Sequence, residues 1–134
     1  MKLCIDVGNT QVKLGVYDSE GKMQHFARIE HLTEAALEEI LSDWTIEYAI
    51  LSSVRAEHEL VLGYLTERLK KVVKLSSELP LPITNQYKTP KTLGNDRLAG
   101  VVGASVLYPN ENVLVVDAGT CIKYDFINAN NVYL

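Results

Sequence analysis

A short segment of the same pattern occurs twice in the sequence, once near the start and once near the end. Each copy has an apolar strand, then Asp, then Val or Ala, then Gly and Thr, and finally the start of a returning strand with Lys. The copies cover residues 3–13 and 114–123, and Asn9 has no counterpart in the second. The wide separation excludes the short period of a solenoid. The repeat therefore predicts one supersecondary unit used twice, once in each of two lobes.

The residue types in this repeat suit phosphate binding. Gly8 and Gly119 let the backbone approach a phosphate without a Cβ in the way. The N–H groups of a turn and a Thr hydroxyl can donate to phosphate oxygens. An Asp at the end of a buried strand is costly unless it meets a cation or hydrogen-bond donors. Two such hairpins that face each other would hold a nucleotide phosphate chain and its metal. A single copy alone is more simply explained as an ordinary Asp-Gly or Gly-Asn turn.

The periodicity of the first part of the chain predicts an α/β fold. Three runs with strand character open the chain and predict a three-stranded antiparallel meander. Helical and extended segments then alternate, which indicates a mixed sheet with helices on its faces. Two lysines near the end of the second helix suit the helix dipole. The predicted elements are strands 3–7, 12–16 and 23–29, a helix from an N-cap at Thr33 through Leu41, strand 48–52, a helix over 57–71 ending with Lys70 and Lys71, and strand 72–75.

The second part of the chain begins with an irregular, proline-containing segment over residues 76–93. A long irregular segment inside a compact domain is usually functional or disordered. Residues 94–97 then open an apolar helix, and the repeated hairpin follows as strands 113–116 and 121–127. We expect a domain boundary near Pro109, which gives a first lobe over residues 1–108 and the start of a second lobe over residues 109–134.

The composition excludes several classes of protein. The chain has 134 residues and a net charge of −4, which argues against a nucleic-acid binder that neutralises phosphates and gives no support to a polybasic membrane anchor. The longest uncharged apolar stretch, residues 98–108, is shorter than the roughly 20 residues that span a bilayer. Cys4 and Cys121 each lie in an apolar run, which predicts buried, reduced thiols and a cytoplasmic protein.

These motifs resemble those of the type III pantothenate kinases, members of the superfamily that includes acetate kinase, sugar kinases, Hsp70 and actin. The first turn alone indicates only the superfamily, whereas Gly-x-Asp-Arg at this distance before Asp-Ala-Gly-Thr is much more specific. The resemblance implies a ribonuclease H-like first lobe followed by the first hairpin of a second, similar lobe. The residues that carry it are Asp6-Val7-Gly8-Asn9-Thr10 with Lys13, Tyr87 with Pro90, Leu93-Gly94-Asn95-Asp96-Arg97, and Asp117-Ala118-Gly119-Thr120.

The resemblance implies a role for each motif in ATP-dependent phosphorylation of pantothenate to 4′-phosphopantothenate, the first step of coenzyme A synthesis. Asp96 would be the general base that takes the proton from the primary hydroxyl of pantothenate. Asp6 would lie near Mg²⁺, and Asp117 would ligate a monovalent cation, K⁺ or NH₄⁺. The pantothenate-binding residues would be Tyr87, Gly94, Asn95, Asp96 and Arg97, and the ATP-binding residues would be Asp6, Val7, Gly8, Asn9, Thr10, Gln11, Val12, Lys13 and Thr120.

The residues themselves allow simpler explanations as well. A carboxylate at a helix start is stabilised by the free N–H groups there, so Asp96 could be a plain helix cap. Arg97 could be a solvated charge, Tyr87 a packing residue, and Lys13 an ordinary exposed strand lysine. Phosphoryl transfer depends mostly on positioning and charge neutralisation, so a weak base such as Asp96 would suffice.

Two features depart from the family pattern. Lys123 stands where family members usually carry Thr, and it either adds positive charge near the second turn or points to solvent. The sequence also ends soon after the second hairpin, whereas family members continue into a lobe that supplies substrate contacts and much of a homodimer interface. We therefore expect residues 1–134 to be a fragment that is weak or inactive alone. The alternatives are another small-molecule kinase of the superfamily and a non-catalytic nucleotide-binding or regulatory homologue.

Overall fold

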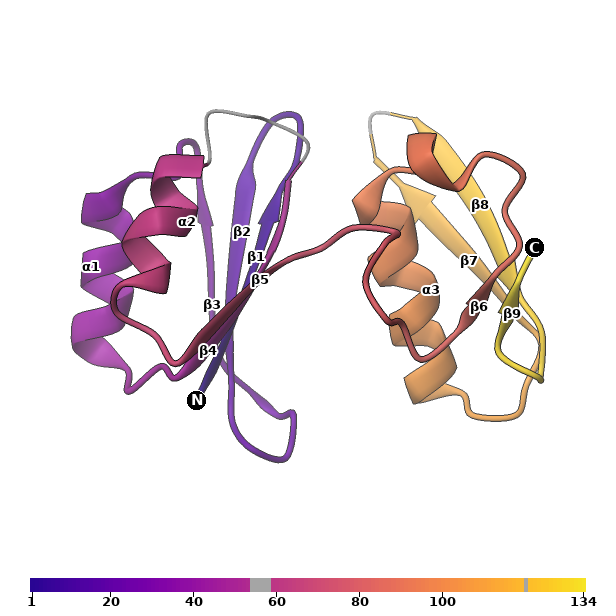
Figure 1. Cartoon of the computed structure of the whole chain (residues 1–134), viewed down its shortest axis with the longest axis horizontal. Coiled ribbons are helices and arrows are strands. Elements are labelled where there is room, and N and C mark those ends of the chain that lie inside the picture. Colours follow the sequence, from indigo (N-terminus) through magenta and orange to yellow (C-terminus); the bar gives the residue numbers. More distant parts are fainter. Residues whose placement is uncertain (54–58, 120) are drawn as a thin grey trace. The chain divides into compact units, whose positions relative to one another are not determined.

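The structure, a computed structural model, describes residues 1–53, 59–119 and 121–134, and their contacts form two compact units, Met1–Leu75 and Ser76–Leu134 (Figure 1). The sequence suggested a boundary near Pro109 instead. The contacts place the division before the proline-containing segment, because the long helix after this segment packs against the second hairpin.

The first unit contains a five-stranded mixed sheet in the order β3-β2-β1-β4-β5. The first three strands form the predicted antiparallel meander, and β1, β4 and β5 run parallel to one another. This is the predicted α/β arrangement of a meander followed by alternating helices and strands. The strands are β1 (Lys2–Val7), β2 (Val12–Tyr17), β3 (Met23–Ile29), β4 (Tyr48–Ser52) and β5 (Lys71–Lys74).

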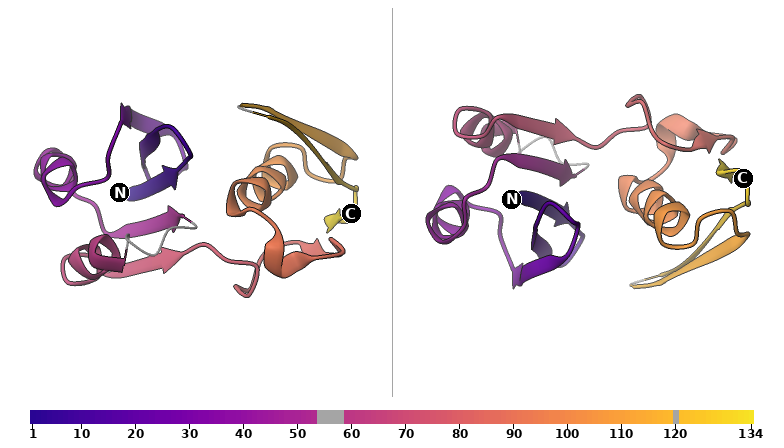
Figure 2. Two further views of the ribbon diagram at one scale, coloured as in Figure 1. Left: turned by 90° about the horizontal axis from the view of Figure 1, so that it is seen from above. Right: turned by 90° about the horizontal axis from the view of Figure 1, so that it is seen from below.

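Two helices, α1 (Glu34–Asp43) and α2 (Glu59–Thr66), lie on one face of this sheet (Figures 1 and 2). Thr33 caps α1 as predicted, because its hydroxyl accepts a hydrogen bond from the Ala36 N–H at 3.2 Å. Leu37 of α1 and Leu65 of α2 are fully buried and join the core formed by β1, β2 and β4.

Helix α2 is shorter than the predicted helix over residues 57–71. The predicted start at Glu57 lies outside the described residues, and the helix ends at Thr66. The placement of Lys70 and Lys71 at the C-terminal end of a helix is therefore wrong. The chain turns after α2 so that Lys71 can begin β5, and the Lys70 N–H donates to the Glu47 carbonyl at 2.9 Å. Pairing with β4 outweighs the local helical pattern.

The prediction of two buried cysteines is also wrong, since Cys4 and Cys121 are both exposed free thiols. Side chains alternate between the two faces of a strand. In β1 the core positions belong to Leu3 and Ile5, so Cys4 between them points to the other face. Cys121 lies in the turn that precedes β8 rather than in a core position.

The second unit contains a four-stranded sheet in the order β6-β9-β8-β7. Residues 76–93 are mostly irregular, as predicted, but they include a two-residue strand that pairs in parallel with the last strand. Strands this short have no periodicity, so neither was predicted. The elements are β6 (Thr84–Asn85), the 3₁₀ turn η2 (Pro90–Thr92), α3 (Asn95–Leu107), β7 (Val113–Ala118), β8 (Ile122–Ile127) and β9 (Val132–Tyr133).

Helix α3 packs against one face of the β7–β8 hairpin through the buried side chains of Leu98, Val101 and Ala104. On β8 the alternation directs residues 123, 125 and 127 toward this face, whereas the apolar side chains at 122, 124 and 126 are exposed on the other. Polar groups on the inner face of β8 therefore meet the start of α3. In the described part of the chain, no helix is long and apolar enough to cross a membrane.

Candidate active site

The first repeated turn joins β1 and β2. The Gly8 N–H donates to the Gln11 carbonyl at 3.0 Å, and a Cβ on Gly8 would lie only 3.1 Å from that oxygen. The two sides of the turn approach so closely at Gly8 that a larger residue would not fit without a shift of the backbone. Asn9, Thr10 and Gln11 are exposed at the tip of the turn. The turn therefore presents polar groups and backbone to solvent, as a phosphate-binding turn requires.

The strands on either side of this turn orient its charged residues. Asp6 lies opposite Lys13 in the ladder, and Lys13 Nζ is 3.5 Å from Asp6 Oδ2. Val7 lies opposite Val12, which is buried, so the side chain of Val12 belongs to the core and only its backbone is available to a ligand. Asp6 remains partly exposed, with 40% of its side-chain surface accessible.

The second repeated turn has the same construction. Asp117 lies opposite Lys123 in the β7–β8 ladder, and the Gly119 N–H donates to the Cys121 carbonyl at 3.2 Å. Thr120, the residue expected to contact ATP, lies outside the described residues. In both hairpins an Asp before the turn therefore faces a Lys after it, so the repeat is structural as well as sequential.

Asp96 lies in the first turn of α3, where the sequence placed it. Its Oδ1 accepts the Arg97 N–H at 2.9 Å, so the carboxylate folds back over the helix start. Gly94 caps the helix, and a Cβ there would collide with Asp96 Oδ1. Asn95 is the first residue of α3. Geometry thus explains the glycine of the Gly-Asn-Asp-Arg motif, because Gly94 leaves free the space that the Asp96 carboxylate occupies.

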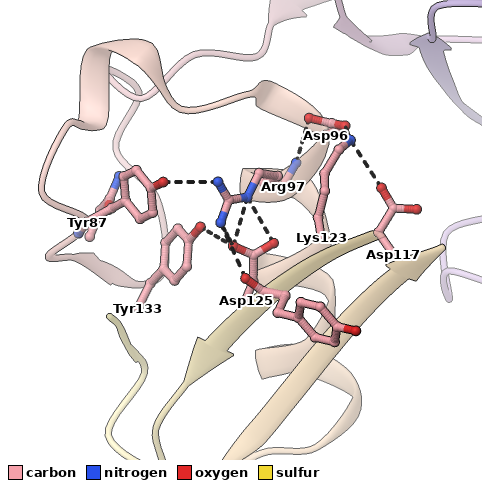
Figure 3. A network of polar contacts seen from close by, with 9 residues as sticks. Tyr87, Asp96, Arg97, Asp117, Lys123, Asp125 and Tyr133 are labelled. Atoms are coloured by element: carbon pink, nitrogen blue, oxygen red, sulfur yellow. Dashed lines mark hydrogen bonds and ion pairs between the residues drawn. The ribbon is translucent and has the colours of Figure 1, made fainter. Parts of the chain in front are cut away.

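Lys123 joins two of the predicted site residues. Its Nζ pairs with Asp96 Oδ2 and lies 3.2 Å from Asp117 Oδ2 (Figure 3). Hydrogen bonding to Asp96 raises the pKa of Lys123. Partial burial acts to raise the pKa of Asp96, but the hydrogen bonds from Lys123 and the Arg97 amide outweigh it and keep that pKa below its usual value. Lys123 therefore points into the site and not to solvent.

Arg97 is anchored by a buried carboxylate that sequence reasoning did not include in the site. Its Nε lies 2.9 and 3.1 Å from the two carboxylate oxygens of Asp125, and its Nη2 lies 2.5 Å from Asp125 Oδ1 (Figure 3). Nη1 donates to the Tyr87 hydroxyl at 3.0 Å, and Nη2 also donates to the Tyr124 carbonyl at 3.3 Å. Of the five guanidinium N–H groups, only one on Nη1 then has no partner among the described residues.

Tyr133 completes this network from β9. Its hydroxyl donates to Asp125 Oδ1 at 2.5 Å, and its ring stacks on Tyr87 with centroids 5.6 Å apart. Burial and the neighbouring Asp125 carboxylate raise the pKa of Tyr133, so the hydroxyl stays protonated. The one signal for Asp125 was an acidic residue in phase with Ile127 on the second strand of the repeated hairpin; nothing in the sequence marked Tyr133.

The second unit thus brings together Tyr87, Asp96, Arg97 and Asp117, with Lys123 among them. The predicted residues of the first turn belong to the first unit. A single, partly exposed carboxylate such as Asp6 suits Mg²⁺, which keeps waters and takes its other ligands from phosphates. No group of three or more His, Cys, Asp or Glu residues that could hold a metal occurs in the part of the chain that the structure describes.

A shallow cavity of about 410 Å³ lies beside Tyr87. This cavity is lined by Gln86, Tyr87, Lys88, Thr89 and Leu134, all in the described part of the second unit. Asp96 is not among these residues, so the cavity does not contain the candidate general base.

A solved structure shares this fold. A ROK family protein from Streptococcus pneumoniae TIGR4, determined in complex with sucrose, superimposes with a TM-score of 0.51 over 99% of this chain and 47% of that one. The sequences are 16% identical, so the likeness concerns the fold alone. It confirms the prediction of an α/β fold.

Curated relatives are more similar to this chain in sequence than that structure is. The type III pantothenate kinase of Phocaeicola vulgatus is 41% identical over 133 residues, which are 99% of this chain and 54% of that protein. The type III pantothenate kinase of Flavobacterium johnsoniae is 37% identical over an alignment of 136 positions, which covers 100% of this chain and 55% of that protein. The chain thus spans about half the length of these relatives. A model of the type III pantothenate kinase family matches residues 2–134, and the chain therefore belongs to that family.

Proposed function

We propose that the full-length protein carrying this sequence transfers the γ-phosphate of ATP to the primary hydroxyl of pantothenate. Family membership supports a kinase, and the arrangement of Asp96 is the observation that carries the proposal. Its carboxylate lies at the start of α3, with one oxygen held by the Arg97 amide and the other directed at the Lys123 ammonium. A carboxylate held in this way has one oxygen free to exchange partners.

The reaction forms a bond between the pantothenate hydroxyl oxygen and the γ-phosphorus. The bond from that phosphorus to the bridging oxygen breaks, and ADP leaves with the electron pair. Asp96 Oδ2 takes the hydroxyl proton after exchanging Lys123 for the substrate. The lowered pKa makes Asp96 a weak base. This is acceptable because the transition state of phosphoryl transfer is loose and depends mainly on positioning and charge neutralisation.

The first turn supplies groups for the phosphates of ATP. The exposed Asn9, Thr10 and Gln11 lie at its tip, and Lys13 adds a positive charge beside Asp6. Asp6 would hold Mg²⁺, which neutralises the charge on the phosphate oxygens when it is bound. Thr120 is proposed as a further ATP contact from the second turn.

Tyr87 and Arg97 offer donors for the carboxylate of pantothenate. The Tyr87 oxygen accepts from Arg97 Nη1, so its own O–H proton is available to a substrate. Arg97 offers its remaining Nη1 N–H, while its other N–H groups stay on the Tyr87 hydroxyl, Asp125 and the Tyr124 carbonyl. Two donors side by side suit the two oxygens of a carboxylate.

Three further points belong to this proposal. The full-length protein acts in the cytoplasm, and it acts as a homodimer. The 134-residue chain alone has little or no activity, because it spans only about half the length of the relatives.

The test is Asp96→Asn in the full-length protein, with Asp43→Asn as the control because Asp43 is exposed at the end of α1. We expect the pantothenate-dependent rate of Asp96→Asn to fall about 100-fold or more, the usual contribution of a positioned base. ATP binding, measured by calorimetry, should be unchanged. A rate near that of the unmodified protein would refute the role of Asp96.

A screen of other hydroxyl acceptors separates this proposal from a different small-molecule kinase. Phosphorylation of another acceptor in preference to pantothenate would favour that alternative. Binding of ATP by the unmodified full-length protein without any turnover would favour a non-catalytic homologue. The contact between Lys123 and Asp96 is the observation that makes this last alternative worth testing.

A further inference from the structure

A lysine side chain lies where the family resemblance implied a monovalent cation. The ammonium group of Lys123 contacts Asp117, the expected ligand of that cation, at 3.2 Å, and it also pairs with Asp96. All three residues belong to the second unit. The two carboxylates therefore already share one positive charge that belongs to the chain.

A second cation fits poorly at Asp117. One carboxylate oxygen of Asp117, Oδ2, already contacts the ammonium group, and a second positive charge at this spacing would repel the first. An ammonium group carries the same charge as K⁺ and is of similar size, so it can neutralise the same oxygens.

The fold holds Lys123 in this place. It lies on the inner face of β8, opposite Asp117 in the ladder, and only 30% of its side chain is exposed. The equivalent Lys13 of the first hairpin lies farther from its partner, at 3.5 Å from Asp6, and is 50% exposed. Among the described residues, Lys123 has a second carboxylate partner at a helix start, Asp96, and Lys13 has none.

We propose that Lys123 is a built-in replacement for the monovalent cation, so that the second hairpin of this chain neither binds nor needs K⁺ or NH₄⁺. The replacement by a side chain is independent of the reaction. Its kinetic consequence, a kinase that works without K⁺, rests on the proposed function.

The first test measures binding with the chain itself. The variants are Lys123→Thr, which restores the family residue, and Lys123→Met, which removes the charge but keeps an unbranched side chain. Lys91→Thr is the control, because Lys91 is an exposed lysine of the same unit. Thermal unfolding is followed in KCl, NaCl and LiCl at equal ionic strength, and ²⁰⁵Tl NMR detects binding of Tl⁺ as a probe for K⁺.

We expect the unmodified chain and Lys91→Thr to unfold at the same temperature in all three salts and to leave the Tl⁺ signal unchanged. Lys123→Thr and Lys123→Met should unfold about 4 °C lower in LiCl, because two carboxylates lose their shared cation. They should regain part of this shift in KCl, with a broadened Tl⁺ signal. K⁺-specific stabilisation of the unmodified chain would overturn the proposal, and so would the lack of any K⁺ response in both variants.

Lys123→Arg guards against a variant that fails to fold. It keeps the positive charge, so it should fold and show no K⁺ response; a K⁺ response like that of Lys123→Thr would overturn the proposal. In the full-length protein, removal of K⁺ should change the rate of the unmodified enzyme less than about two-fold and should slow Lys123→Thr about ten-fold, the effect of a typical charge interaction in a site. Complete lack of turnover would refute the proposed function and leave the binding result standing.

Discussion

Asp125 is the residue whose loss should most disturb the second unit. Its carboxylate, of which 3% is exposed, accepts hydrogen bonds from Arg97 Nε and Nη2 and from the buried Tyr133 hydroxyl. Asp125→Ala leaves the Arg97 guanidinium without its counter-charge and the Tyr133 hydroxyl without an acceptor. Breaking a buried ion pair from one side costs about 3–5 kcal/mol.

The exposure of Arg97 places the expected cost at the lower end of that range. Its side chain is 23% exposed, and its Nη1 and Nη2 keep their contacts with Tyr87 and the Tyr124 carbonyl. We therefore expect Asp125→Ala to lower the free energy of local unfolding of the second unit by about 3 kcal/mol. Asp125→Asn keeps one acceptor oxygen and loses only the charge, so it should cost about 2 kcal/mol, typical of a hydrogen bond to a charged group.

Amide hydrogen exchange measures the free energy of local unfolding for individual helices and strands. In Asp125→Ala the amides of α3 and β8 should exchange about 100-fold faster, since 1.4 kcal/mol corresponds to a factor of ten. The amides of β1 and β2, which belong to a unit with its own core, provide the internal reference. Asp117→Asn is the matched control, because 53% of that side chain is exposed and its loss should cost less than about 1 kcal/mol. An effect of Asp125→Ala no larger than that of Asp117→Asn would refute the reasoning.

Three other predictions concern the same unit. Gly94→Ala should displace the Asp96 carboxylate, so the rate of the full-length protein should fall at least ten-fold while the unfolding temperature changes little; an unchanged rate would contradict the close approach. Tyr87→Phe removes a hydroxyl that accepts one hydrogen bond but keeps the ring stacked on Tyr133, so urea denaturation should show a loss of about 1 kcal/mol, and no loss would contradict it. The pKa values of Lys123 and Tyr133 are raised in the folded chain, so their contribution to stability is complete below their ordinary values near pH 10 and is lost as the pH rises through the folded values. Unfolding temperatures between pH 9 and 12 should fall less steeply in Lys123→Met, and equal slopes would contradict this.

Much of the first unit could be predicted because its signals are local. The strand character of β1–β3, the Thr33 cap and the order of helices and strands each depend on neighbouring residues. The predictions failed where a long-range contact decided the outcome. Helix α2 ends early because Lys71 must pair with β4, and Cys4 is exposed because its neighbours in β1 occupy the core side of the sheet.

The candidate site divides in the same way. Asp96 and Arg97 could be named as candidates because the Gly-Asn-Asp-Arg motif is contiguous, lies at a helix start and resembles the family motif. Asp125 and Tyr133 could not, because their importance depends on β8 and β9 lying beside Tyr87 and α3. Nothing in the local sequence around either residue carries that information.

The amino-acid sequence alone predicts the repeated Asp-Gly-Thr hairpin, the α/β order of the elements and the motif at the start of α3. Each of these features depends on turns and periodicities of a few residues. The direction of the Lys123 side chain depends on the tertiary structure, because strand phase and the packing of α3 together direct its ammonium group toward Asp96 and Asp117. Lys123, the residue that departs from the family pattern, therefore joins Asp96 and Asp117, two carboxylates that the family resemblance marks as functional.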